Sequence, residues 1–199
     1  MNKKAMELSM NFIVILILSI VIFAGGLALS YKFFGKAQEY RTSIDSDTEA
    51  QIERILSSGE TVAIPRNRKD IRIGESYVFG LGVFNGLGHS QDFYISMAFD
   101  EAFDTATNSH IEADGTYIND KWIFGKERKY TIDNNDHEKI GLFVQVDDRI
   151  KNSATTTPGT YIFNVCICTS PCAGDGCSTA SATGMFYDSH VQKIYVTVP

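Results

Sequence analysis

One uncharged, apolar stretch near the start of the chain limits what it can fold into. Residues 8–31 contain no formally charged side chain, and residues 12–29 are almost entirely aliphatic, Phe or Gly, with Ser19 the polar exception. About 20 such residues in a helix cross ~30 Å of hydrocarbon. A secretory signal peptide has a shorter apolar core, of roughly 7–15 residues. We therefore predict a retained transmembrane helix over 7–34, preceded by a basic leader over 1–6. A buried core helix is the weaker alternative, because this helix would be apolar on every face.

Charge and cysteine content indicate which side of the membrane holds the rest of the chain. Nearly equal numbers of basic residues flank the apolar stretch on its two sides, so they do not determine the orientation of the helix in the membrane. Residues 37–199 carry 14 Lys and Arg against 23 Asp and Glu, a net charge of −9, which argues against nucleic acid and anionic lipid as partners. All four cysteines fall within residues 166–177, and disulfides are favoured outside the cytosol. We expect a single-pass cell-membrane protein, with its N-terminus cytoplasmic and its C-terminal domain extracytoplasmic.

The segment that follows the apolar stretch has a helical period. Tyr40, Ile44, Ile52 and Leu56 recur at helical intervals among charged and polar residues. We predict an amphipathic extension over 35–59 that continues the transmembrane helix without a break and stops at Ser57-Ser58-Gly59. Its apolar stripe must pack either on its own domain or on a neighbouring subunit.

From residue 60 the apolar pattern changes to the period of two that is typical of strands. Seven to nine short β-branched and aromatic runs separated by turn residues predict an immunoglobulin-like antiparallel β-sandwich over 60–199. Tyr161, after Pro158-Gly159, stands near a tyrosine-corner position. Residues 100–121 and 147–157 are predicted to be polar loops. The predicted strands are 62–64, 71–73, 77–84, 93–99, 122–124, 129–132, 140–146, 161–168 and 191–198.

The extreme N-terminus resembles the class III signal peptides of archaeal type IV pilin-like proteins. Those have basic residues and then a Gly-Gln-x-Ser-x-Glu-Phe pattern that runs into an apolar helix; here Ser9 and Phe12 match. Met6, Glu7 and Asn11 stand where Gly, Gln and Glu are usual. The resemblance covers about 30 residues. It implies cleavage between Met6 and Glu7 by a prepilin-type peptidase, followed by packing of the apolar helix with other filament subunits.

The departures from the pattern have physical consequences. Met6 is larger than the small residue that fits a tight pocket before a scissile bond. Asn11 can form hydrogen bonds but cannot supply the charge with which an internal Glu pairs in a low-dielectric bundle. Two interpretations stay open. One is a processed pilin-like subunit or minor component of an archaeal surface filament, with the lipid bilayer and other subunits as partners. The other is an unprocessed single-span module, stator-like or adhesion-type, that binds a cell-envelope partner.

The cysteines form a C-x-C-x3-C-x4-C cluster. Cys166 and Cys168 lie two apart on a predicted strand, about 6.5–7 Å between Cα atoms, which disfavours a bond between them. Two pairings remain: 166–172 with 168–177, or 166–177 with 168–172. Either would staple a loop onto its strand. A four-thiolate zinc or iron site is a weaker alternative, because the usual paired knuckles are absent.

Other candidate sites are weak. Residues 133–138, Asp-Asn-Asn-Asp-His-Glu, lack the spacing of an EF-hand and are predicted to form a polar hairpin turn rather than a calcium site. Asn85-Gly86 and Asp114-Gly115 are turn signals. No G-x-S-x-G, P-loop or Rossmann fingerprint is present, and we expect neither an enzyme nor a cofactor. All four histidines are expected in solvated loops: His89, His110, His137 and His190.

Overall fold

The computed structural model describes residues 12, 14–23, 44–172, 177, 187–188 and 191–199. The chain divides into two compact units, residues 1–41 and 42–199. In the first unit, residues 12 and 14–23 are helical, and the large apolar side chains among them are exposed. A search of the described residues finds no helix that is both long and apolar enough to cross a membrane. Most of the predicted transmembrane segment lies outside these residues.

The second unit begins with helix α2, Ser46–Ser57. Asp45 caps it in an extended conformation (φ −68°, ψ 149°), and its carboxylate accepts a 2.8 Å hydrogen bond from the backbone N–H of Thr48. The prediction of one unbroken helix is therefore wrong at this point, because the N-cap geometry starts a new helix. The predicted stop is confirmed: the helix ends at Ser57, and Gly59 follows with a φ of +103°.

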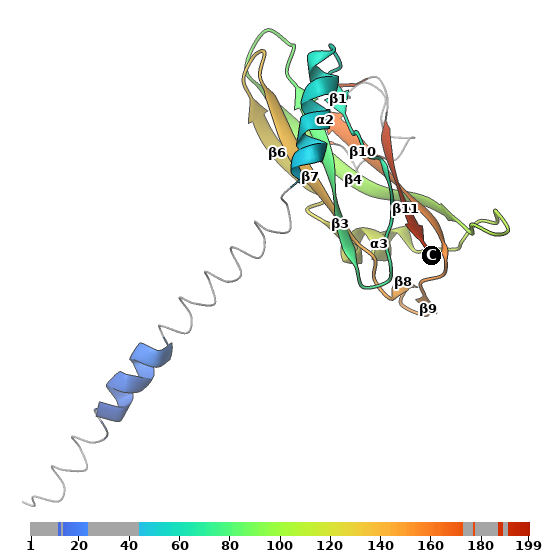
Figure 1. Cartoon of the computed structure of the whole chain (residues 1–199). Coiled ribbons are helices and arrows are strands. Elements are labelled where there is room, and N and C mark those ends of the chain that lie inside the picture. The colour runs from blue at the N-terminus through green and yellow to red at the C-terminus, as the bar shows by residue number, and fades with distance from the viewer. Residues whose placement is uncertain (1–11, 13, 24–43, 173–176, 178–186, 189–190) are drawn as a thin grey trace, which may run out of the picture. The chain divides into compact units, whose positions relative to one another are not determined.

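Two sheets pack face to face in this unit (Figure 1). Neighbouring strands are antiparallel, apart from β2 and β11, which are parallel. Sheet A has the order β1 (Val62–Ala63), β3 (Ser76–Phe84), β7 (His137–Gln145), β5 (Ile123–Phe124). Sheet B has the order β2 (Arg68–Asp70), β11 (Gln192–Val198), β10 (Gly159–Cys168), β4 (Gln91–Phe103), β6 (Glu127–Ile132). Strands β8 (Arg149–Lys151) and β9 (Ala154–Thr155) form a small separate hairpin. Helix α3 consists of residues Gly115–Lys121.

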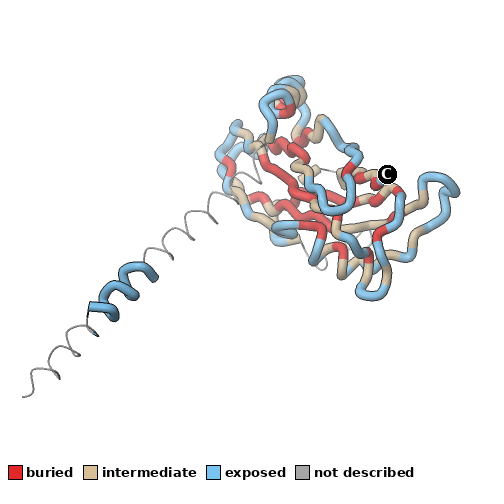
Figure 2. Tube along the Cα trace, turned by 60° about the horizontal axis from the view of Figure 1, so that its bottom comes forward, coloured by how far each residue is buried: buried red, intermediate tan, exposed pale blue. Residues whose placement is uncertain are grey.

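Alternate residues of the long strands make the core between the two sheets. Phe79 and Leu81 of β3 belong to the same buried cluster as Phe163 and Val165 of β10, and each is completely buried. Figure 2 shows this burial along the middle of the strands. The period-two pattern places these residues on the inner faces. The predicted mainly β sandwich is confirmed.

A tyrosine corner ties the start of β10 to the preceding turn. The Tyr161 hydroxyl donates a 2.9 Å hydrogen bond to the carbonyl oxygen of Thr157. The Tyr161 ring centroid lies 4.7 Å from that of Trp122, whose Nε1 donates to the carbonyl oxygen of Arg149 at 3.0 Å. The geometry agrees with the position predicted for Tyr161 and is a feature of immunoglobulin-like sandwiches.

Several local predictions are wrong. The second strand covers 68–70, not 71–73, because Ile71 turns into the core after it. Residues 133–136 do not close a hairpin, since β6 belongs to sheet B and β7 to sheet A. Asp114 is not in a tight turn but is the N-cap of α3. The segments predicted as polar loops contain α3, the end of β4, and the β8–β9 hairpin.

Candidate functional site: the two covered faces of the sandwich

Helix α2 covers the outer face of sheet A, where β3 has glycines. Gly80 and Gly82 point outward between core residues, and neither is among the positive-φ glycines, so their role is to leave space. A Cβ on Gly80 would lie 2.6 Å from Cγ2 of Thr48, and one on Gly82 would overlap Ile52. The amphipathic stripe of α2 therefore packs on its own domain, with Ile52 and Leu56 buried against β1 and β3. Alternating glycines in an apolar strand are the sequence signal for such a close approach.

A polar cluster at the edge of this contact holds α2 to β7. Oε1 of Glu53 lies 2.7 Å from Nζ of Lys139 and 3.1 Å from Nε2 of His137. The Lys139 hydrogen bond, with a smaller contribution from His137, lowers the pKa of Glu53 below its ordinary value.

His137 is the first residue of strand β7 and is half-buried, whereas the sequence predicts a solvated loop for it. His89 and His110 are exposed, and His190 lies outside the described residues.

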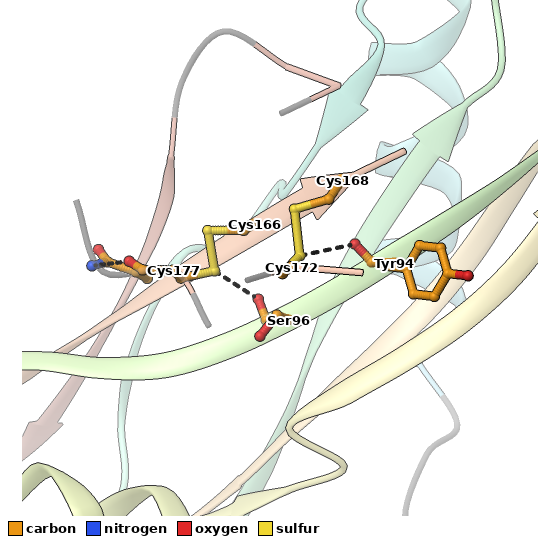
Figure 3. Close-up of a disulfide and its surroundings, with 7 residues drawn as sticks. Tyr94, Ser96, Cys166, Cys168, Cys172 and Cys177 are labelled. Atoms are coloured by element: carbon orange, nitrogen blue, oxygen red, sulfur yellow. Dashed lines mark hydrogen bonds between the residues drawn. A yellow bond between two sulfur atoms is a disulfide. The ribbon is translucent and has the colours of Figure 1, made fainter. Parts of the chain in front are cut away.

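Two disulfides lie on the outer face of sheet B (Figure 3). Cys166 is bonded to Cys177 and Cys168 to Cys172, with Cα–Cα distances of 5.5 and 6.0 Å. This is one of the two pairings left open by the sequence, and all four sulfurs are bonded rather than free thiolates. With Ala98, three of these cysteines form a small buried cluster. The bonds fasten the residues after β10 onto the strand that precedes them.

Two carbonyl oxygens of β4 and one side chain of β10 lie beside the disulfides. Sγ of Cys177 lies 3.2 Å from the carbonyl oxygen of Ser96, and Sγ of Cys172 lies 3.7 Å from that of Tyr94 (Figure 3). These are close S···O contacts, since a disulfide sulfur carries no hydrogen to donate. Nδ2 of Asn164 donates a 3.1 Å hydrogen bond to the carbonyl oxygen of Cys177. Within the described part of the chain, no group of three or more His, Cys, Asp or Glu is arranged to hold a metal ion.

The structure does not test the predicted processing residues. Met6, Glu7, Ser9 and Asn11 lie outside the described residues, and Phe12 is helical with an exposed side chain. Cleavage after Met6 stays a prediction. Sequence reasoning missed the helix-docking glycines, Glu53 and Asn164. The glycines had a recognisable signal, whereas the roles of Glu53 and Asn164 depend on tertiary contacts that no local pattern encodes.

Comparisons with known proteins find likenesses of structure only. No protein-family model and no curated protein sequence matches this chain. The Pseudomonas fluorescens alkylpurine DNA glycosylase AlkC has a TM-score of 0.38 at 10% identity over 76% of this chain, which covers only 34% of that enzyme. PapD-like domain 7 of human CEP192 has a TM-score of 0.35 at 9% identity, over 70% of this chain and 85% of that domain.

A third similar structure is the CssB subunit of enterotoxigenic Escherichia coli colonization factor CS6, complemented with a donor strand from CssA. Its TM-score is 0.37 at 11% identity, over 70% of this chain and 97% of the subunit. At these TM-scores and identities, none of the likenesses carries an argument about function.

Proposed function

We propose that this chain is a membrane-anchored, extracytoplasmic structural protein, a pilin-like subunit or minor component of a surface filament. The observation that carries the proposal is the tight packing of α2 on sheet A. A subunit held by its N-terminal part needs the first element of its domain to be firmly attached to that domain. The glycine-lined contact with Ile52 and the Glu53–Lys139 ion pair attach α2, which is that first element, to the sandwich.

Two further features support this role. An apolar stretch over 12–29 is long enough to anchor the chain in a bilayer. Two disulfides in the sandwich favour an oxidising compartment outside the cytosol. The mechanism is helix burial. A helix that is apolar on every side packs against lipid or against copies of itself. In a filament, contacts with other copies of the helix would replace its contacts with lipid.

The native N-terminus tests the proposal. Mass spectrometry of the protein from its own membranes should find a mature chain that begins at Glu7. A Met6→Gly variant should be cleaved at least as fast as the natural chain, because a small residue fits before the scissile bond, and Ala5→Gly is the matched control. Negative-stain images of sheared surface material should contain filaments that carry the protein.

An intact terminus at Met1 or Asn2, together with the absence of the protein from sheared filaments, would overturn this function. That result would favour the unprocessed single-span binding module instead. A terminus at Glu7 without filaments would leave a processed protein and reject the filament role alone.

A further inference from the structure

A row of four outward-facing residues crosses the half of sheet B that lies away from the disulfides. The register places Arg68 of β2 beside Tyr195 of β11, Tyr195 beside Ile162 of β10, and Ile162 beside Glu101 of β4. An irregularity in the β10–β4 register at Ile162/Phe163 brings Glu101 to the outer face, because Asp100 is left without a partner opposite it. The four strands span roughly 14 Å from one end of the row to the other.

The row runs from a positive end to a negative end, and neither charge forms an ion pair within 4.0 Å among the described residues. Arg68 is exposed, and its guanidinium Cζ stands 5.1 Å from the centre of the Tyr195 ring. Glu101 is half-buried and forms no ion pair within 4.0 Å in that part of the chain. One charged neighbour is Lys193, whose pKa is raised by its hydrogen bond to Asp100 and, to a smaller extent, by Glu101. Tyr195 and Ile162, between them, are partly exposed. An aromatic and aliphatic centre with charged ends is the composition of a protein contact surface.

This order of charges is complementary to itself under one particular symmetry. When two copies meet face to face about a two-fold axis parallel to the strands and midway between β10 and β11, the row of one copy is reversed on the other. Arg68 then faces Glu101 of the second copy and Tyr195 faces Ile162, so the Arg68–Glu101 pair forms twice in the dimer. An axis across the strands would instead place Arg68 opposite Arg68, and like charges repel.

The adjacent rows are compatible with this arrangement. One runs Asp70, Thr197, Thr160, Phe103, so no like charge lies opposite Asp70, and Thr197 faces Thr160 of the second copy. On the other side of the row, Lys193 is already paired with Asp100 at 2.8 Å, so this pair adds no net charge.

We propose that this half of sheet B is a contact surface for a second copy of the chain, in which Arg68 and Glu101 form two symmetric ion pairs around Tyr195 and Ile162. The contact is separate from any packing between N-terminal helices. It therefore stands whether or not the leader is cleaved.

Site-specific cross-linking of the full chain in mild detergent tests the geometry. All four native cysteines are in disulfides, so an added cysteine is the one free thiol. Two differently tagged populations, Arg68→Cys and Glu101→Cys, are mixed and treated with a short bismaleimide. The mixture should yield a dimer that carries both tags, and neither population alone should cross-link efficiently. Homotypic Arg68→Cys cross-links, or no cross-link in the mixture, would overturn the proposal.

Charge exchange tests the energetics. Arg68→Glu and Glu101→Arg should each raise the dimer dissociation constant by about tenfold or more, because two attractive pairs become repulsive. The double variant should restore dimerisation to near the natural level. Arg72→Glu is the matched control, because Arg72 follows the same edge strand but lies outside the row, and it should dimerise normally. Sedimentation velocity provides the readout. Equal dissociation constants in all variants would reject this face as the contact.

Discussion

Gly82 of β3 lies so close to Ile52 of α2 that a methyl group on the glycine would overlap the isoleucine side chain. We expect Gly82→Ala to lower the free energy of unfolding by about 1–3 kcal/mol, because the helix must move or repack. Urea denaturation followed by the fluorescence of Trp122, the single tryptophan, measures the change. The control is Gly115→Ala, where a Cβ would meet Phe99 at an ordinary 3.5 Å. Equal effects of the two changes would show that α2 does not need the glycine.

The Glu53 cluster should make α2 docking sensitive to acid. The neighbouring Lys139 and His137 lower the pKa of Glu53 below its ordinary value of 4.5. Its contribution is therefore present above that value and is lost as the pH falls through the folded-state pKa. Hydrogen exchange of the α2 amides should accelerate below about pH 4.5 relative to Glu53→Gln, in which the titrating group is absent. Parallel pH profiles for the two proteins would contradict this prediction.

The two disulfides should differ in their contribution to stability. The chain-entropy relation gives about 3 kcal/mol for the loop closed by Cys166 and Cys177, and about 2 kcal/mol for the shorter loop closed by Cys168 and Cys172. Paired Cys→Ala variants of each bond, compared by urea denaturation, measure the two values. Each double variant controls for the other. A larger loss from the shorter loop would mean that packing of the cysteine cluster, rather than loop closure, dominates.

The hydroxyl group in the tyrosine corner should add about the free energy of one hydrogen bond to the stability of the fold. Burial raises the pKa of Tyr161, so its hydroxyl stays a neutral donor to Thr157 at physiological pH. Tyr161→Phe keeps the ring against Trp122 and should cost about 1 kcal/mol of unfolding free energy. Tyr195→Phe is the control, since the structure gives the Tyr195 hydroxyl no hydrogen bond within the described residues. A cost below the error of the measurement would show that ring packing alone holds the corner.

The sheet architecture could be predicted because its strands are long and alternate clearly. The runs at 77–84, 140–146 and 161–168 became β3, β7 and β10 with shifts of a few residues. The sequence could not predict which strands pair. Two strands joined by a short polar turn have the same sequence pattern whether they belong to one sheet or to two different sheets. Residues 133–138 illustrate this: the sequence predicts a hairpin turn there, whereas residues 133–136 cross between the sheets and residues 137 and 138 begin β7.

Short elements were missed for a different reason. Helix α3 has seven residues and a single buried residue within it, Ile118, so its sequence has too few turns to show a helical period. The break before α2 was missed because Ile44 fits the apolar spacing while the Asp45 cap interrupts the backbone. The disulfide pairing depended on where residues 172 and 177 return to β10, which spacing alone does not determine.

The extra residue in β4 at Asp100 has a consequence for variation in this protein. Deleting Asp100 would remove the residue that has no partner opposite it in β10, and Glu101 would still lie opposite Ile162 and keep its outward side. A deletion elsewhere in β4 would instead move the residues between it and Asp100 to the wrong face of the sheet. A deletion scan along β4, scored by yield of folded protein, should therefore find one tolerant point at Asp100 within an otherwise intolerant strand.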